Sequence, residues 1–294
     1  MPVRDQGGYR QSALVLGAAQ LGMAYGIANT TGDLGQPAVD ALLRRAAELG
    51  VTHVDTARAY GESEARIGAA PDKPAVITKI APGEPDVEAS AATSLTTLNL
   101  ERATFLLHRA ADVPHAWDGL RKVKDAGQAD RIGVSVQNPA ELLDVAKLPD
   151  LGYVQLPCNV LDRRWLTPEV ADALSGDVVV TVRSVYLQGL LTAGSGVRWP
   201  HVPDPHRDAA VAILDEVAAD LDFSNRAGLC VAYTLGLPWV TSVVIGAETL
   251  DQLGENVRLA SRPGLAAAER EMLLDRLPEA PAQLLDPSTW GSAR

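Results

Sequence analysis

The sequence has few cysteines and fewer basic than acidic residues. Its two cysteines, Cys158 and Cys230, lie in apolar stretches without the CxxC spacing of zinc and redox motifs, so we expect buried free thiols. Lys and Arg together number 26 against 37 Asp and Glu, which gives a net charge of −11. This charge repels nucleic acid and anionic lipid at long range, so we expect neither as a partner.

Long uninterrupted apolar runs are also missing. No stretch approaches the length that spans a bilayer, and the polar start MPVRDQGGYRQ lacks the apolar region of a signal peptide, so we expect a cytoplasmic protein. Low-complexity tracts are absent, as are internal repeats with periods of roughly 20 to 50 residues, which argues against a solenoid. The 294 residues are 47% hydrophobic, which is enough for one large core, and we expect residues 1–294 to form one domain.

Short β-type runs alternate with longer helical segments along the chain. This alternation is typical of parallel strands joined by crossover helices. The expected strands are Ser12–Ala19, Val51–Ala57, Ala75–Ile80, Thr104–Arg109, Arg131–Val136, Tyr153–Cys158, Val178–Val185 and Thr241–Gly246. Eight such strands predict an α/β fold, the (β/α)8 TIM barrel.

The helix between the first two strands has the clearest pattern. Val39, Leu42, Leu43, Ala46 and Leu49 fall on one helical face, with a proline near the start and a glycine just past the end. Weaker periodicity predicts further helices at Glu88–Leu98, His115–Ala126, Ala140–Ala146, Glu169–Leu174 and Asp208–Leu221. The longest irregular stretch, Thr192–Arg207, follows the seventh strand, where barrel loops usually shape the substrate pocket.

Polar side chains stand at the carboxyl ends of most expected strands, the rim at which barrels of this type carry their chemistry. In chain order the residues at these ends are Gln20, Asp55, Lys79, His108, Ser135, Gln155, Arg183, Ser184 and Gly246. Any one of them is readily explained as an ordinary, partly exposed polar residue. An Asp, a Lys and a His on three neighbouring strands are harder to explain by packing, so we expect the active site at the C-terminal rim of the strands.

Asp55, Lys79 and a nearby tyrosine indicate acid–base chemistry. A Lys that lies against a carboxylate can stay protonated when it is partly buried, and it can lower the pKa of a nearby phenol from its usual value of about 10. Tyr60, five residues after Asp55, is that phenol, and it becomes a usable general acid for the reduction of a carbonyl. His108 has no second His or Cys at ligand spacing, so we expect no metal.

The segment HVDTARAYGESEARIG resembles the signature of the aldo-keto reductase family, a strand-end D-T-A followed by Y-G and an acidic segment that opens a helix. The likeness continues through TKI, FLLHR, IGVSV, YVQLPCNVLDRR, RSVYLQGLL and SVVIGAETLDQLGENV, from about Ala13 to Asn256, in the order and strand positions of that family. The resemblance implies an enzyme that reduces an aldehyde or ketone to an alcohol with NADPH or NADH.

The resemblance also implies roles for single residues. Tyr60 would protonate the carbonyl oxygen while Lys79 and Asp55 tune it, and His108 would orient the carbonyl. Ser135 and Gln155 match positions that hold the nicotinamide carboxamide, the SVYLQGLL stretch matches the loop over the pyrophosphate, and the segment from Thr249 takes the adenosine end. The residues expected around the cofactor are Gln20, Ser135, Gln155, Arg183, Ser184, Leu187, Gly189, Gly246, Glu248, Gln252, Glu255 and Asn256.

The chain departs from the family pattern beside the nicotinamide. Val136 stands where many relatives place an asparagine, which puts one carboxamide contact in doubt. Arg183 stands where many relatives place an aromatic residue under the nicotinamide ring. A guanidinium can stack on a ring face or hold an anionic group of the substrate, and it adds charge near the cofactor.

A third departure concerns the 2′-phosphate of NADPH, which relatives usually bind with Lys or Arg after the eighth strand. Residues 246–249 and Gln252 include no basic side chain. Glu248 would repel the phosphate but could accept hydrogen bonds from the ribose hydroxyls of NADH. The alternative is that Glu248 points to solvent and Arg258 or Arg262 reaches the phosphate.

The residues expected to contact substrate are Tyr25, Arg109, Trp165 and Trp199. Each also has a structural explanation: Trp165 could cap the barrel, Arg109 could pair with a loop carboxylate, and Trp199 could anchor an irregular segment. A pocket with Arg and Trp would suit a polar sugar-like or cyclitol ketone. Two other function classes stay open, a nicotinamide-binding regulatory subunit and an isomerase or dehydratase that uses the cofactor transiently.

Overall fold

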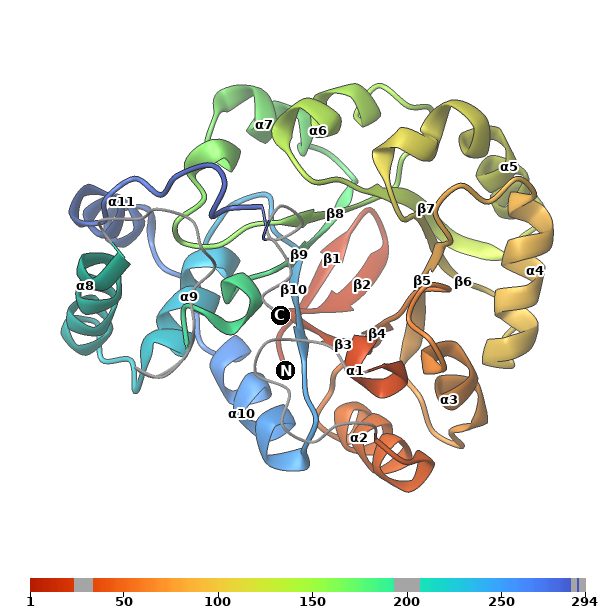
Figure 1. Cartoon of the computed structure of the whole chain (residues 1–294), viewed down its shortest axis with the longest axis horizontal. Helices are drawn as coiled ribbons and strands as arrows, with labels where there is room; N and C mark the ends of the chain where they lie inside the picture. The colour runs from red at the N-terminus through yellow and green to blue at the C-terminus, as the bar shows by residue number, and fades with distance from the viewer. Residues whose placement is uncertain (24–33, 193–206, 287–289, 291–294) are drawn as a thin grey trace.

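Eight parallel strands close into a barrel at the centre of the molecule (Figure 1). The computed structural model describes residues 1–23, 34–192, 207–286 and 290. The barrel strands are β3 (Leu14–Gly17), β4 (His53–Asp55), β5 (Ala75–Ile80), β6 (Ala103–Leu107), β7 (Ala129–Ser135), β8 (Tyr153–Pro157), β9 (Val179–Arg183) and β10 (Ser242–Gly246). They pair in the order β10-β3-β4-β5-β6-β7-β8-β9, which confirms the predicted (β/α)8 barrel.

Helices surround the barrel (Figure 1). They are α1 (Ala19–Gly22), α2 (Gln36–Glu48), α3 (Ser63–Ala69), α4 (Val87–Leu98), α5 (Val113–Asp125), α6 (Pro139–Val145), α7 (Pro168–Ala173), α8 (Arg207–Asp220), α9 (Arg226–Leu235), α10 (Leu250–Ala260) and α11 (Ala267–Arg276). Short 3-10 turns lie at η1 (Ala110–Asp112), η2 (Arg163–Trp165) and η3 (Leu187–Gly189). The helices predicted by periodicity correspond to α2, α4, α5, α6, α7 and α8, and the five for which a range was predicted, α4 to α8, begin within two residues of the expected start. Within the described part of the chain, no helix is long and apolar enough to cross a membrane.

Local sequence signals explain where many of these helices begin. The side chains of Asn138, Thr167, Asn225 and Thr249 each accept a hydrogen bond from a backbone N–H of the helix that follows them. Proline occupies one of the first two positions of α2, α5, α6 and α7, where a missing N–H costs nothing. The helices α6, α7, α9 and α10 therefore begin directly after their capping residues.

The strand side chains alternate between two apolar regions. Val15, Ile77, Leu106, Tyr153 and Val179 form a cluster inside the barrel. A much larger cluster fills the space between the strands and the surrounding helices and includes Leu14, Leu16, Leu42, Val54, Phe105, Leu120, Val134 and Leu229. Burial on both faces is typical of parallel sheets, and it holds the carboxyl ends of all eight strands at one rim.

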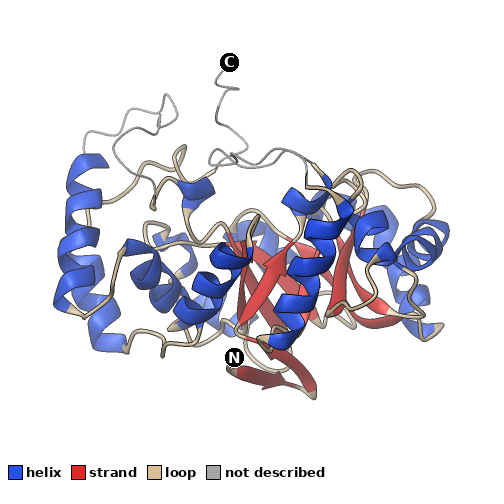
Figure 2. Cartoon of the chain, turned by 90° about the horizontal axis from the view of Figure 1, so that it is seen from below, coloured by secondary structure: helices blue, strands red, loops and turns tan. Residues whose placement is uncertain are grey.

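An N-terminal hairpin, which the sequence analysis did not predict, lies across the other end of the barrel (Figure 2). Its strands are β1 (Val3–Gln6) and β2 (Tyr9–Ser12), joined by Gly7 and Gly8, which both have positive φ (55° and 79°). Gln11 Nε2 donates to Thr181 Oγ1 at 3.0 Å, and Tyr153 Oη donates to Gln11 Oε1 at 3.1 Å. The hairpin therefore covers the amino-terminal end of the barrel with a polar layer.

Glycine is required where β7 passes β8. A Cβ added to Gly133 would lie 1.8 Å from the carbonyl oxygen of Tyr153, a backbone atom fixed by strand pairing, whereas a Cβ on Gly254 in α10 would meet nothing within 4 Å. We expect Gly133→Ala to lower the free energy of unfolding by about 3 kcal/mol or to prevent folding. Gly254→Ala should leave it unchanged or raise it by up to about 1 kcal/mol. Denaturant unfolding of both variants checks this, and equal stability of the two would contradict it.

Candidate active site

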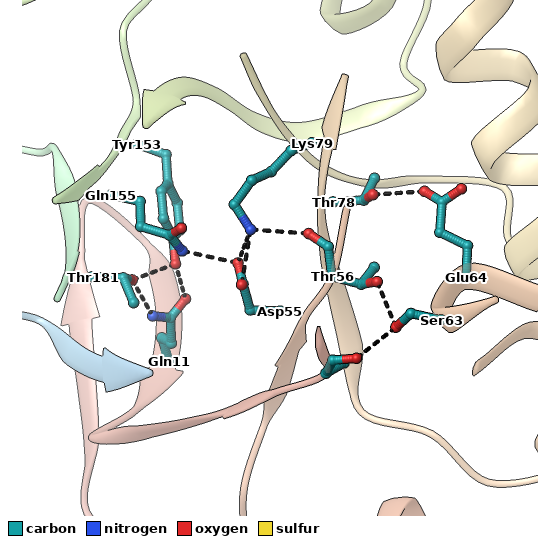
Figure 3. A network of polar contacts seen from close by, with 11 residues as sticks. Gln11, Asp55, Thr56, Ser63, Glu64, Thr78, Lys79, Tyr153, Gln155 and Thr181 are labelled. Carbon is teal, nitrogen blue, oxygen red and sulfur yellow. Dashed lines mark hydrogen bonds and ion pairs between the residues drawn. The ribbon is translucent and has the colours of Figure 1, made fainter. Parts of the chain in front are cut away.

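A buried ion pair stands at the carboxyl end of β4 and β5. Lys79 Nζ donates to Asp55 Oδ1 at 2.7 Å, to Asp55 Oδ2 at 2.8 Å and to the carbonyl oxygen of Thr56 at 2.9 Å (Figure 3). Gln155 Nε2, from β8, donates to Asp55 Oδ1 at 2.8 Å. Lys79 is 2% exposed and Asp55 is 4% exposed, so both charges depend on each other and on these neighbours for compensation.

The other two predicted catalytic residues lie beside this pair. Lys79 Nζ is 5.3 Å from the centre of the Tyr60 ring. The rings of Tyr60 and His108 are 6.2 Å apart between centres and nearly perpendicular, at 81°. The structure thus brings together a cation, a phenol and an imidazole from the ends of consecutive barrel strands and the loop after β4.

His108 is held in its neutral form. Burial, together with the nearby charges of Lys79 and Arg183, lowers the pKa of His108 to about 4. Its Nδ1 atom is buried and finds no hydrogen-bond partner in the part of the chain that the structure describes. At neutral pH this ring can donate one hydrogen bond to a bound carbonyl without carrying a charge.

The loop that carries Tyr60 is fixed by contacts that the sequence analysis missed. Ser63 N donates to the carbonyl oxygen of Tyr60 at 3.0 Å, Ser63 Oγ donates to that of Ala18 at 2.8 Å, and Thr56 Oγ1 donates to Ser63 Oγ at 2.8 Å. A Cβ on Gly22 would lie 2.1 Å from the Tyr60 carbonyl oxygen. Tyr60 is therefore positioned by a close approach of the end of α1 to the loop after β4, and the sequence signal for this was the place of Ser63 in GESEARIG.

A cleft of about 610 Å³ opens at the same rim and extends from Asp55 and Tyr60 to α10. This volume lies in the usual range of small-molecule and cofactor sites. Ten of the expected cofactor residues border it: Gln20, Gln155, Arg183, Ser184, Gly189, Gly246, Glu248, Gln252, Glu255 and Asn256. Ser135 and Leu187 are buried and do not border the cleft in the described part of the chain.

The loop after β9 brings its backbone close to the cleft. Ser184, Gln188 and Gly189 border the cleft with positive φ (60°, 59° and 93°). Tyr186 also borders the cleft, and its buried hydroxyl finds no hydrogen-bond partner among the described residues. A backbone near the cleft and an unsatisfied hydroxyl in its wall fit a polar, elongated ligand such as a dinucleotide. The sequence analysis placed Tyr186 and Gln188 in the SVYLQGLL stretch over the pyrophosphate without singling them out, and the positive φ of Gln188, a non-glycine residue, leaves no sequence signal.

The far end of the cleft is acidic. Glu248, Asp251 and Glu255 border it. Arg258 donates to Glu255 at 2.6 and 2.8 Å, and these hydrogen bonds lower the pKa of the Glu255 carboxyl. The Arg262 guanidinium lies 4.2 Å from the centre of the Phe223 ring. Neither arginine borders the described part of the cleft, so both basic residues that the sequence offered for a phosphate are engaged elsewhere.

Trp165 and Arg109, the two expected substrate residues that the structure describes, do not border the cleft. Trp165 is 0% exposed in the hydrophobic core, and its indole N–H donates to Asp162 Oδ2 at 3.0 Å, so the prediction that it contacts substrate is wrong. The Arg109 side chain is 51% exposed and pairs with Asp112 at 2.9 Å, which is the alternative that the sequence analysis named. Tyr25 and Trp199 lie outside the described residues.

Metal and thiol chemistry find no support in the described residues. Across residues 1–23, 34–192, 207–286 and 290, no group of three or more His, Cys, Asp or Glu side chains is arranged to hold a metal ion. Cys158 and Cys230 are both free and buried, as expected from their apolar surroundings.

Comparisons with known proteins identify the family and the fold. The model of the aldo/keto reductase family matches residues 13–272. No curated protein sequence matches the chain. Among solved structures, the holo form of aldo-keto reductase AKR11C1 from Bacillus halodurans is similar, with 21% identity, a TM-score of 0.78 and coverage of 97% of this chain and 100% of that chain. Its apo form gives 22% identity, a TM-score of 0.74 and the same coverage.

These structural matches show a shared fold, and the family match covers most of the chain, including the segments that carry Asp55, Tyr60 and Lys79. The chain therefore belongs to the aldo-keto reductase family of NAD(P)H-dependent oxidoreductases.

Proposed function

We propose that the protein reduces an aldehyde or ketone to an alcohol and that Tyr60 is the proton donor. The observation that carries the proposal is the buried Lys79–Asp55 pair, whose ammonium lies 5.3 Å from the centre of the Tyr60 ring at one end of the cleft. A cation held this close to a phenol favours loss of the phenolic proton. The carboxylate keeps the lysine charged without leaving a net charge buried.

Each residue then has a defined part in the reaction. A reduced nicotinamide held in the cleft would supply the hydride that adds to the carbonyl carbon. Tyr60 gives its proton to the carbonyl oxygen, and the neutral His108 ring donates a hydrogen bond that orients this oxygen. Gln155 uses its amide nitrogen on Asp55, which leaves its amide oxygen to accept from the nicotinamide carboxamide.

The contacts around Tyr60, His108 and Gln155 say less about the identity of the substrate. The expectation of a sugar-like or cyclitol ketone depended on four residues, of which Trp165 and Arg109 lie away from the cleft. A test therefore needs a panel of carbonyl compounds that includes polyhydroxy ketones, simple aldehydes and 2-oxo acids. Net consumption of NAD(P)H with any of them supports the reductase. Cofactor binding without consumption would support the regulatory subunit, and product formation without consumption would support the isomerase or dehydratase.

Replacement of Tyr60 tests the proton donor. We expect Tyr60→Phe to lower kcat by about 10³-fold or more while cofactor binding stays within a few-fold, because only the proton donor is removed. Tyr9→Phe is a matched control, since it removes a hydroxyl at the opposite end of the barrel, where Tyr9 Oη contacts Thr104 Oγ1 at 2.8 Å. Steady-state kinetics and cofactor titration of both variants check this, and near-normal turnover by Tyr60→Phe would refute the assignment.

Replacement of Lys79 tests the role of the ion pair. We expect Lys79→Met to lower kcat about as strongly as Tyr60→Phe and to change the pH profile, because the phenol loses its neighbouring cation and Asp55 keeps only its contact with Gln155. Lys73→Met, which removes a lysine that contacts the Gly68 carbonyl oxygen away from the cleft, should change neither. If Lys79→Met folds and keeps the wild-type rate and pH profile, the proposed influence of Lys79 on Tyr60 does not exist.

We further propose that NADH binds at least as well as NADPH. The support is the acidic far end of the cleft, with Glu248, Asp251 and Glu255 on its wall and Arg258 engaged by Glu255. A 2′-phosphate placed there would meet carboxylates, whereas free ribose hydroxyls could donate to them. Glu248 begins this segment, two residues after β10 ends at Gly246.

Replacement of Glu248 tests this preference. We expect Glu248→Arg to shift the ratio of NADH to NADPH dissociation constants toward NADPH by about 1 to 3 kcal/mol. Glu271→Arg, an equal charge change on the exposed face of α11, is the matched control and should not shift the ratio. A strong wild-type preference for NADPH that Glu248→Arg leaves unchanged, but Arg258→Ala or Arg262→Ala removes, would place the phosphate at those arginines instead.

A further inference from the structure

Glu64 is a buried carboxylate that the proposed reaction does not use. It lies in the first turn of α3, after the loop that carries Tyr60, and its side chain is 5% exposed. Its Oε1 atom accepts a hydrogen bond from Thr78 Oγ1 at 2.6 Å (Figure 3), and its Oε2 atom accepts one from Arg58 Nη1 at 3.2 Å. A buried carboxylate is tolerated only with such partners. The two contacts join α3 both to β5 and to the loop between β4 and α3.

The first partner, Thr78, directly precedes Lys79 on β5. Ile77 belongs to the apolar cluster inside the barrel, whereas Val76 belongs to the cluster between the strands and the helices. Because side chains alternate along a strand, Lys79 points into the barrel and Thr78 points out toward the helices. Glu64 therefore holds β5 from the outside, at the position next to the lysine.

The second partner, Arg58, lies two residues before Tyr60 in the same loop. Its backbone N–H donates to the carbonyl oxygen of Lys79 at 3.1 Å, and its guanidinium pairs with Glu64. Arg58 precedes Tyr60 and Glu64 follows it, so their ion pair closes the loop around the phenol. Both ends of this loop are attached to β5, one through the Lys79 carbonyl and the other through the Thr78 hydroxyl.

The place of the phenol relative to the lysine matters for the proposed function, on which this inference rests. The Lys79 ammonium lies 5.3 Å from the centre of the Tyr60 ring, and the attraction between a cation and a phenolate falls with distance. We propose that Glu64 is a positioning residue that holds the Tyr60 loop at this distance from Lys79. Glu64 does not border the described part of the cleft, so it acts through its two partners and not on the substrate.

Ionisation of the Tyr60 phenol can be measured without substrate or cofactor. The change in ultraviolet absorbance that belongs to this phenol is obtained by subtracting the pH titration of Tyr60→Phe from that of wild type. His108, the imidazole beside the phenol, has a pKa of about 4 and does not change charge at alkaline pH. Burial raises the pKa of four other tyrosines, which keeps their absorbance change small over most of the titration: Tyr9, Tyr153, Tyr186 and Tyr233.

We expect Glu64→Gln to raise the pKa of Tyr60 by about 0.5, the effect of moving a phenolate about 1 Å farther from a cation, and to lower kcat by about tenfold. The amide can keep the hydrogen bond from Thr78 but loses the charge that holds Arg58. Thr78→Val should act in the same direction, because it removes the donor to Glu64. Thr78→Ser keeps that donor and should keep both values close to those of wild type. Cofactor dissociation constants should stay within a few-fold in all three variants.

Glu141→Gln is the matched control. Glu141 also lies in the first turn of a helix that follows a barrel strand, where it accepts from Gln137 N at 2.8 Å and from Asn138 Nδ2 at 3.1 Å, away from the described cleft. Its replacement should change neither the pKa of Tyr60 nor kcat. A lower free energy of unfolding in Glu64→Gln and Thr78→Val, with wild-type values of the phenol pKa and kcat, would make Glu64 a purely structural residue and overturn the proposal.

A failure of the proposed function would give a different result. If wild type consumed no NAD(P)H with any carbonyl compound while Glu64→Gln still raised the pKa of Tyr60, the reduction would be refuted and the positioning would stand. If Glu64→Gln reduced a carbonyl compound at the wild-type rate with an unchanged phenol pKa, the reduction would stand and the positioning would be refuted. Should Glu64→Gln not fold, Arg58→Met removes the same ion pair from a side chain that is 31% exposed, and the same increase in the phenol pKa is expected.

Discussion

The site depends on one interaction, the pairing of Lys79 with Asp55, both almost fully buried at the carboxyl ends of β5 and β4. Two charges removed from water are tolerable only when each is matched and hydrogen-bonded, and here the Thr56 carbonyl and the Gln155 amide complete the set. These contacts join the ends of β4, β5 and β8, so the pair also constrains how three strand ends are placed. From Thr56 the contacts continue to Ser63 (Figure 3). The backbone N–H of Ser63 donates to the carbonyl oxygen of Tyr60, so the loop that carries the phenol is linked to the ion pair.

Charge is distributed unevenly along the cleft. The reaction end combines a closed ion pair, a neutral imidazole and Arg183, while the opposite end carries Glu248, Asp251 and Glu255. The net charge of −11 does not show where along the cleft the charged side chains lie. Local placement of a few side chains therefore matters more for ligand choice than the overall charge.

Sequence reasoning identified the barrel and the strand-end residues because both follow from repeating patterns. Parallel strands bring Asp55, Lys79, His108 and Gln155 to one rim, and this placement needs no knowledge of side-chain packing. The N-terminal hairpin was not predicted, because its strands have four residues each and are largely polar. The burial of Trp165 could not be read from sequence, since a tryptophan next to a barrel rim fits a pocket wall and a core equally well. The close approach of Gly22 to the Tyr60 loop depends on contacts between segments far apart in the sequence, and the positive φ of Gln188, a non-glycine residue, leaves no sequence signal.

The hairpin has a consequence for how protons reach the barrel interior. Gln11, Tyr153 and Thr181 fill the end beneath the catalytic residues with a hydrogen-bonded layer, and the ion pair above it is almost completely shielded from solvent. Exchange with bulk water is then directed to the cleft side, and ligands that fill the cleft close that route. In the proposed reaction, Tyr60 would recover its proton only after the alcohol has left. Reprotonation of Tyr60 and release of the product would then be coupled in each catalytic cycle.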